Sequence, residues 1–132
     1  FNVPTMQFAF KADKDEASRD LDASLKKFGK HFEFILTQNE GEFLVGRKLS
    51  VADIIMGESL TSFIEFSPTC LNNYPQLKQL QEEVVSERNI KEYLNSGNRW
   101  RLPDEQYVID IARVLCRPLP SHMSESNRFV KG

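Results

Sequence analysis

The chain has 132 residues, of which 40% are hydrophobic, and this length suits one domain with a buried core rather than two. Its 17 basic residues are scattered among 19 acidic ones, and the net charge of −2 excludes a strongly basic surface of the kind that binds nucleic acid or an anionic membrane. No apolar run approaches the roughly 20 residues of a membrane span, and the two cysteines are expected to be free thiols, so we expect a soluble, cytoplasmic protein.

Helical periodicity runs through the chain, because apolar residues recur at intervals of three and four and hairpin signals are missing. We therefore predict an all-α fold, a bundle of about five helices. The clearest helix is expected over residues 13–38. Gly29 lies inside its apolar stripe at a cost of about 1 kcal/mol relative to alanine, so we expect a close helix crossing or a bend there. The stripe consists of Ala17, Leu21, Leu25, Phe28, Phe32 and Ile35.

Proline and glycine mark the boundaries of the next three helices. The second helix is predicted over residues 51–66, before Pro68, because proline cannot continue the hydrogen-bond ladder of a helix. Pro75 is expected to begin the third helix in its first turn. Asn89 is expected to cap a short fourth helix, which Gly97 ends in the position after the C-cap.

A last helix is predicted to begin at Asp104 and Glu105, because carboxylates are stabilised near the positive end of a helix. Residues 117–132 contain two prolines and three serines without periodicity, and we expect them to form a flexible tail. The apolar face of the last helix is expected to carry Tyr107, Val108, Ile111, Val114 and Leu115.

Ser50 and Asp53 have the spacing of a capping box, with aspartate in place of the usual glutamate. The Ser50 hydroxyl is expected to accept from the amide of Asp53, and the Asp53 carboxylate to accept from the amide of Ser50. Leu49 precedes the cap and is placed to pack against Ile54. This pattern by itself indicates only an ordinary helix start.

The surrounding segment carries more information. Residues 43–54 read FLVGRKLSVADI and resemble the glutathione transferase segment (Y/F)LVG-x-K-L-S-x-A-D-I. Residues 74–78 and 89–94 are similar to two further segments of that family. Residues 98–105, with the helix predicted after them, resemble the loop and extra C-terminal helix of the alpha class. The chain is therefore identified as similar to the all-helical C-terminal domain of an alpha-class-like glutathione transferase.

This resemblance implies a helical domain over residues 1–116, a tail over residues 117–132, and no thioredoxin-like N-terminal domain within this chain. In the family, that N-terminal domain carries most of the glutathione site and activates its thiol, so glutathione is expected as a co-substrate only of a chain that includes it. No catalytic residue is assigned here. The C-terminal domain would supply the wall of a pocket for a hydrophobic electrophile, with the last helix as a mobile lid.

The resemblance also implies site residues. The hydrophobic substrate pocket would be lined by Val3, Gln7, Val108, Ile111 and Leu115, and for each of them plain core packing is the alternative. Lys27 aligns with an arginine that contacts glutathione across the dimer interface. Lysine keeps that charge but lacks the planar fork of arginine, so a solvated helix face is the alternative role for Lys27.

The remaining candidates point to no further chemistry. His31 and His122 lack the spacing of a metal site, and no metal or resident cofactor is expected. Cys70 has no basic neighbour in sequence, so an inert thiol is preferred over a nucleophile. The expected partner is a hydrophobic small molecule, and a homodimer is left open. The rival interpretation is a non-enzymatic relative that binds ligands or other proteins through the same helical domain.

Overall fold

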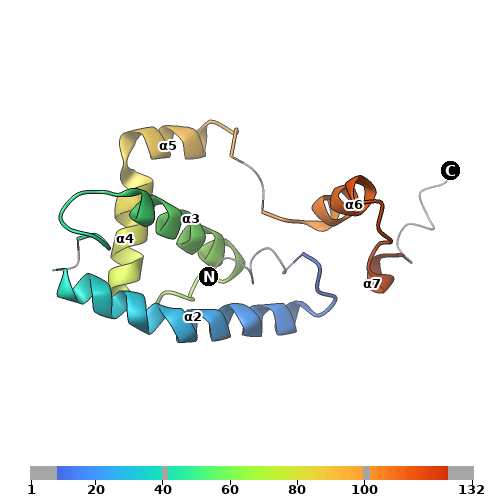
Figure 1. The fold of residues 1–132 in the computed structure, drawn as a ribbon, viewed down its shortest axis with the longest axis horizontal. Coiled ribbons are helices and arrows are strands. Elements are labelled where there is room, and N and C mark those ends of the chain that lie inside the picture. Colours follow the sequence, from blue (N-terminus) through green and yellow to red (C-terminus); the bar gives the residue numbers. More distant parts are fainter. Residues whose placement is uncertain (1–8, 40–41, 100–101, 125–132) are drawn as a thin grey trace.

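The structure is a computed structural model that describes residues 9–39, 42–99 and 102–124. The described residues form helices and loops without strands, so the prediction of an all-α fold is confirmed (Figure 1). The helices are α2 (Lys14–Gln38), α3 (Val51–Phe66), α4 (Pro75–Ser86), α5 (Arg88–Asn95), α6 (Glu105–Val114) and α7 (Ser121–Ser124).

The long helix α2 begins where Asp13 accepts hydrogen bonds from the amides of Asp15 and Glu16, at 2.9 and 3.1 Å. Its buried residues follow the predicted stripe only in the first half. In the second half, the buried positions are shifted by one residue from the predicted stripe. Gly29 and Leu36 are buried there, whereas Phe28 is 37% exposed. A Cβ on Gly29 would lie 2.7 Å from Cε1 of Tyr74, so the glycine makes room for an aromatic ring from the loop before α4.

The main core lies where α2, α3 and α4 meet. Helices α3 and α4 cross closely at Gly57, where an added Cβ would lie 2.6 Å from Cγ1 of Val84. A small residue at a crossing lets two helix backbones approach each other. The sequence pattern predicts such a close approach at Gly29 and gives no sign of the one at Gly57. The buried residues of this core are Leu25, Leu36, Met56, Leu60, Leu71, Tyr74, Leu77, Leu80 and Val84.

Helix α4 receives its N-terminal cap from another helix. The Glu33 carboxylate on α2 accepts hydrogen bonds from the amides of Gln76 and Leu77, at 3.2 and 2.8 Å. Pro75 fills the first turn and has no amide to satisfy. A negative side chain at the positive helix end therefore joins α2 to α4.

The short helix α5 differs at its start from the prediction. It begins at Arg88 with Glu87 as the capping position, so Asn89 lies inside the helix and does not cap it. Glu87 is both the C-cap of α4 and the N-cap of α5. The two helices are therefore separated by this one residue, and position 89 already lies in the first turn of α5. Gly97 follows the C-cap with a φ of 75°, as the C-terminal glycine of a helix does.

Helices α6 and α7 lie beyond the first turns of α2, away from the main core (Figure 1). They form a second, smaller cluster in which Val108 of α6 and Met123 of α7 pack with Ala9. Ile109 and Leu119 pack against this cluster. The described part of the expected tail, residues 117–124, is thus in contact with α6, because Leu119 and Met123 bury apolar surface that periodicity over so short a stretch does not reveal.

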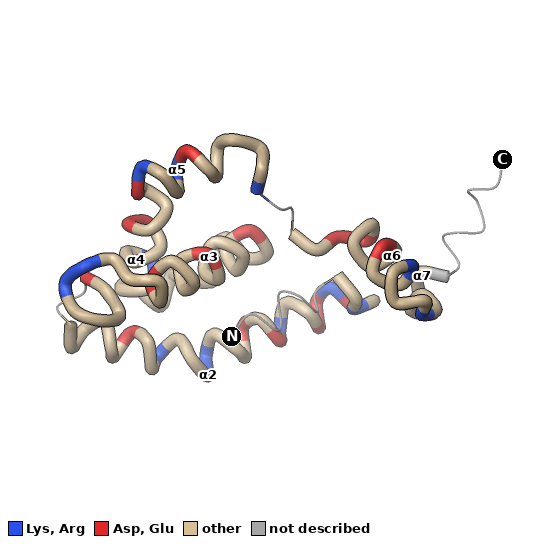
Figure 2. The backbone as a smooth tube through the Cα atoms, turned by 45° about the horizontal axis from the view of Figure 1, so that its top comes forward, with Lys and Arg blue, Asp and Glu red and all other residues tan. Residues whose placement is uncertain are grey.

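Basic and acidic residues are interspersed along α2 and α5 (Figure 2). None of the helices in the described ranges is long and apolar enough to cross a lipid bilayer.

Candidate functional site

One apolar hollow lies beside α6 and has a volume of about 200 Å³. Val108, Ile111 and Leu115 all line it, which places three of the predicted pocket residues on one surface. Val108 is buried, Ile111 is partly buried, and Leu115 is 59% exposed. The other lining residues are Phe10, Ala112, Arg117, Pro118 and Pro120.

Both ends of α6 are closed by specific hydrogen bonds. At its start, the Asp104 carboxylate accepts from the amide of Tyr107 at 2.9 Å. At its end, the amide of Cys116 donates to the carbonyl of Arg113 at 3.2 Å, and the amide of Arg117 donates to the carbonyl of Ala112 at 2.9 Å. Cys116 has a φ of 50°, which completes a Schellman motif with a residue other than glycine in the left-handed position. This turn directs residues 117–120 back along the hollow.

The opposite wall was expected from Val3 and Gln7, and both lie outside the described residues. Phe10 lines the hollow from the segment before α2, and its ring meets the ring of Tyr107 edge to face at 6.1 Å. Phe10 and Arg117 were not predicted as lining residues, because they belong to the wall only through the way the two chain segments fold against α6.

Lys27 lies on the exposed side of α2. Its Nζ stands 5.1 Å from the ring centroid of Phe28, at the distance of a cation–π contact. Lys27 does not line the hollow beside α6.

Ser50 and Asp53 form a capping box at the start of α3. The Asp53 carboxylate is fully buried and accepts from the Ser50 amide at 2.7 Å and from the Ser50 hydroxyl at 2.5 Å. Its other oxygen accepts from the amide of Leu44 at 2.7 Å. The Asn39 side-chain amide holds the same loop from α2 by donating to the carbonyls of Phe43 and Leu44. These bonds give Asp53 a structural role that occupies both of its oxygens.

A second apolar cavity, which we call the α3–α5 groove, has a volume of about 240 Å³ and lies between α3, α4 and α5. Ile54 is 40% exposed and Tyr93 is 48% exposed, so the groove leaves apolar surface open to solvent. The residues lining it are Ile54, Gly57, Glu58, Thr61, Val84, Val85, Ile90, Tyr93, Leu94 and Arg99.

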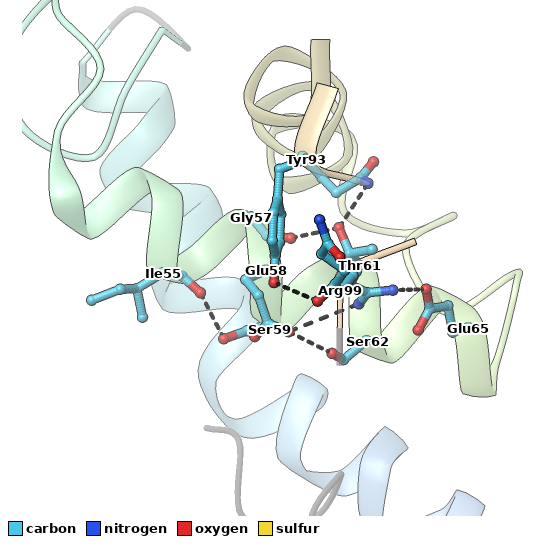
Figure 3. Close-up of polar contacts among 11 residues, drawn as sticks. Ile55, Gly57, Glu58, Ser59, Thr61, Ser62, Glu65, Tyr93 and Arg99 are labelled. Carbon is cyan, nitrogen blue, oxygen red and sulfur yellow. Dashed lines mark hydrogen bonds and ion pairs between the residues drawn. The ribbon is translucent and has the colours of Figure 1, made fainter. Parts of the chain in front are cut away.

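The rim of the α3–α5 groove is held by polar contacts across elements (Figure 3). The guanidinium of Arg99 pairs with the Glu65 carboxylate and lies 3.8 Å from an oxygen of Glu58. Gln81 on α4 donates to the Thr61 hydroxyl at 3.1 Å. The sequence pattern does not single out this rim, since Arg99 is 34 residues from Glu65 along the chain.

The described residues contain no group of three or more histidine, cysteine, aspartate and glutamate side chains arranged to hold a metal ion. Burial, together with the negative charge of Asp22, raises the pKa of the Cys70 thiol. A raised pKa leaves less thiolate at neutral pH than an ordinary cysteine has, which argues against Cys70 as a nucleophile.

Comparisons with known proteins identify the architecture. A sequence model described as the C-terminal domain of glutathione S-transferase matches residues 1–97. The chain is 39% identical over 75 residues to glutathione S-transferase P 2 of Bufo bufo, covering 55% of this chain and 36% of that protein. It is 37% identical over 82 residues to glutathione S-transferase A1 of Bos taurus, covering 62% and 37%.

A longer match joins the chain to glutathione S-transferase alpha-1 of Rattus norvegicus, with 31% identity over 105 residues, 78% of this chain and 47% of that protein. The chain thus spans less than half the length of these relatives. The family match, the alpha-class relatives and the all-helical bundle agree with one another. This chain belongs to the glutathione S-transferase family, as an alpha-like C-terminal domain.

Proposed function

We propose that this domain supplies the hydrophobic pocket and the mobile lid of a glutathione transferase. The reaction joins the glutathione thiolate to a hydrophobic electrophile, and the thiol-activating groups belong to an N-terminal domain outside these 132 residues. The observation that supports the proposal is that Val108, Ile111 and Leu115 line one apolar hollow on α6. A concave apolar surface of this kind is what a small hydrophobic ligand requires.

The lid role rests on how little of α6 is buried. Val108 is the one buried residue of this ten-residue helix, whereas α2 and α3 each bury several side chains. A helix this short needs tertiary packing to be stable in water, since isolated helices below about 12–15 residues are marginal. We therefore expect α6 to open locally at a low free-energy cost, and a ligand in the hollow to hold it closed.

The test is binding of the neutral fluorescent dye N-phenylnaphthylamine, followed by fluorescence and by amide hydrogen exchange. We expect the dye to slow exchange in residues 105–115 and to leave residues 21–35 unchanged. Ile111→Asp should weaken dye binding about tenfold or more, because it places a charge in an apolar cavity. Val114→Asp is the matched control, since Val114 is on the same helix, is 77% exposed and does not line the hollow.

Two results would overturn the proposal. In the first, exchange in α6 is as slow as in α2 and indifferent to the dye. In the second, Ile111→Asp and Val114→Asp bind the dye equally well, which would separate dye binding from the hollow.

A non-enzymatic role in protein binding is the second candidate, and the α3–α5 groove favours it. Exposed apolar residues beside a groove are typical of interaction surfaces. Ile54 and Tyr93 are exposed there, and Ile55 extends the apolar surface along α3. The intact mass and N-terminal sequence of the natural protein separate the two roles. A thioredoxin-like domain of about 80 to 100 residues before Phe1 would support the enzyme, and its absence would support the binding role.

A further inference from the structure

A polar hollow lies between the first half of α2 and the loop that joins α3 to α4, and we call it the α2–loop hollow. Its volume is about 240 Å³. It differs from the two apolar cavities described above, because most of its lining side chains carry a charge or a hydrogen-bonding group. From α2 it is lined by Asp22, Leu25 and Lys26, and from the loop by residues that include Thr69, Asn73 and Tyr74.

Asp22 and Lys26 bring opposite charges to this hollow from neighbouring turns of α2. Both side chains are exposed, and within the described ranges neither joins an ion pair, whereas Asp20 on the same helix pairs with Lys11. Residues four apart on a helix have Cβ atoms about 5–6 Å from each other. The hollow therefore presents one free carboxylate and one free ammonium group close together.

Tyr74 adds a hydrogen-bonding group that has no partner. The residue is only 7% exposed, and its hydroxyl makes no hydrogen bond with any described residue. In that part of the chain, the one fully buried side-chain polar atom without a partner is Oε1 of Gln76. The Tyr74 hydroxyl is therefore not fully buried, and it reaches solvent through the hollow that this residue lines. A polar group left unsatisfied in so buried a side chain is costly, and a ligand atom in the hollow would satisfy it.

The position of the Tyr74 ring brings its hydroxyl toward the two charges. Cζ, the ring carbon that carries the hydroxyl, lies 3.1 Å from the place of a Cβ on Gly29. Gly29 follows Lys26 by three positions and shares its side of α2. Burial, and then the negative charge of Asp22, raises the pKa of both Tyr74 and Cys70. The phenol is thus protonated at neutral pH and can donate, and the thiol adds no charge to the hollow.

The loop wall of the hollow is held by backbone hydrogen bonds. The amide of Asn72 donates to the carbonyl of Thr69 at 3.1 Å, and the amide of Tyr74 donates to the carbonyl of Leu71 at 2.9 Å. The Glu33 carboxylate then fixes the start of α4 directly after the loop. A site that is formed before binding loses less conformational entropy when a ligand enters.

We propose that the α2–loop hollow binds a small free α-amino acid, with its ammonium group on Asp22 and its carboxylate on Lys26 and the Tyr74 hydroxyl. Leu25 is buried beside these groups and offers apolar contact to a short side chain. The size is suitable, since a cavity of about 150 Å³ accommodates benzene, which has as many non-hydrogen atoms as alanine, and this hollow measures about 240 Å³. This site is separate from the pocket on α6 and does not depend on the function proposed for it.

Three related compounds test the proposal, followed through the amide resonances of the isotope-labelled chain. L-Alanine carries both charges, N-acetyl-L-alanine carries only the carboxylate, and L-alaninamide carries only the ammonium group. We expect L-alanine at millimolar concentrations to shift the resonances of residues 22–26 and 67–74 and to leave residues 105–115 unchanged. Each singly charged compound should bind about fivefold more weakly, the upper range for one exposed charge pair.

Variants of the two charged residues assign each charge to its partner. Asp22→Asn should remove the preference for L-alanine over N-acetyl-L-alanine, and Lys26→Gln should remove the preference over L-alaninamide. Lys30→Gln is the matched control, because Lys30 is exposed one turn further along α2 and does not line the hollow. It should bind all three compounds as the parent protein does.

Tyr74→Phe should weaken the binding of L-alanine about three- to tenfold, as expected for the loss of one hydrogen bond to a carboxylate. The urea midpoint at neutral pH should stay at that of the parent protein, which separates lost binding from lost structure. Tyr93→Phe is the matched control, since it removes an exposed hydroxyl at the α3–α5 groove and should leave the binding of L-alanine unchanged.

Four outcomes would overturn the proposal. The first is the absence of shifts in residues 22–26 and 67–74 with L-alanine. The second is equal binding of the three compounds, because a zwitterion would then not be selected. The third is an equal effect of Lys26→Gln and Lys30→Gln, which would indicate a general positive field. The fourth is full affinity for L-alanine in Tyr74→Phe, which would remove the buried hydroxyl from the site.

Discussion

Asp53 connects three parts of the chain through one carboxylate. Its i to i+3 relation to Ser50 is local and is readable from the sequence as a capping box. Its bond to the amide of Leu44 depends on how the preceding loop folds back over the helix start. The carboxylate is fully buried. Removing it would therefore leave the groups that donate to it without a hydrogen-bond acceptor.

Asp53→Ala is expected to lower the free energy of unfolding by about 3 kcal/mol, since it removes a helix cap and charged hydrogen bonds from a buried site. The measurement is the urea midpoint at neutral pH. Asp110→Ala serves as the control, because Asp110 is exposed and its loss should change stability by less than about 0.5 kcal/mol. Equal midpoints for Asp53→Ala and the parent protein would show that the carboxylate does not hold the loop.

Tyr74 is a buried tyrosine whose ring lies against Gly29. Burial raises its pKa above the ordinary value of 10.0, and the negative charges of Asp22 and Glu33 raise it further. A phenol whose pKa is raised by folding stabilises the folded state fully below its unfolded pKa. That contribution disappears as the pH rises through the folded pKa.

Tyr74→Phe should therefore match the parent protein in urea midpoint at neutral pH and exceed it above pH of about 10, where the buried hydroxyl of the parent begins to ionise on unfolding. Urea titrations at both pH values check this. A constant difference between the two proteins across that range would mean that Tyr74 ionises as freely in the folded state as in the unfolded chain.

At the scale of elements, glycine positions decide how closely the helices approach. Gly29 brings the loop before α4 against α2, and Gly57 brings α4 against α3. Position 57 has no room for a side chain, because the Val84 side chain occupies the space that a Cβ would need. The crossing of α3 and α4 therefore depends on a residue that intrinsic helix propensity disfavours.

Gly57→Ala is expected to destabilise the protein by about 1–3 kcal/mol, even though alanine favours helix, because the new methyl group overpacks the crossing. Val84→Ala in the same chain removes two of the three atoms that the new methyl group meets, Cγ1 and Cγ2, and keeps the Cβ of residue 84. The double variant should then be more stable than the sum of the two single effects predicts. Strictly additive effects in urea unfolding would contradict the close contact between the two positions.

At the scale of the whole molecule, the described residues form two apolar clusters of unequal size. The larger one unites α2, α3 and α4, and the smaller one joins Ala9, Val108 and Met123 beside the hollow. The cap and the Schellman motif of α6 close its ends, but its lateral packing is slight. This unequal distribution is the reason that ligand-dependent order is expected at α6 and not in the bundle.

Residues 1–132 by themselves are expected not to accelerate the conjugation of glutathione to an aryl halide. Tyr74 is buried in the main core, Tyr93 lies at the α3–α5 groove, and no tyrosine is among the described residues that line the hollow beside α6. The check is a rate assay on the purified chain against the uncatalysed reaction. Turnover that persists through repurification would show that this chain activates the thiol itself.

Much of the fold was predictable because its determinants are local. Helix periodicity, Pro75 at the start of α4, Gly97 after α5, and the pair of Ser50 and Asp53 all act within a few residues. The segment over residues 43–54 also indicates the family through its residue order alone. Such signals depend on the order of neighbouring side chains, so a single sequence contains them completely.

Long-range contacts were decided only by the tertiary structure. Glu33 caps a helix that begins more than 40 residues later, and Arg99 closes a groove against α3. Arg117 and Phe10 come from opposite ends of the described chain to line one hollow. The spacing of residues along the chain does not predict these contacts, because they depend on how the helices cross and on how the loops fold back against them. The sequence thus determined the helices, their caps and the family, while packing decided which side chains form the candidate site.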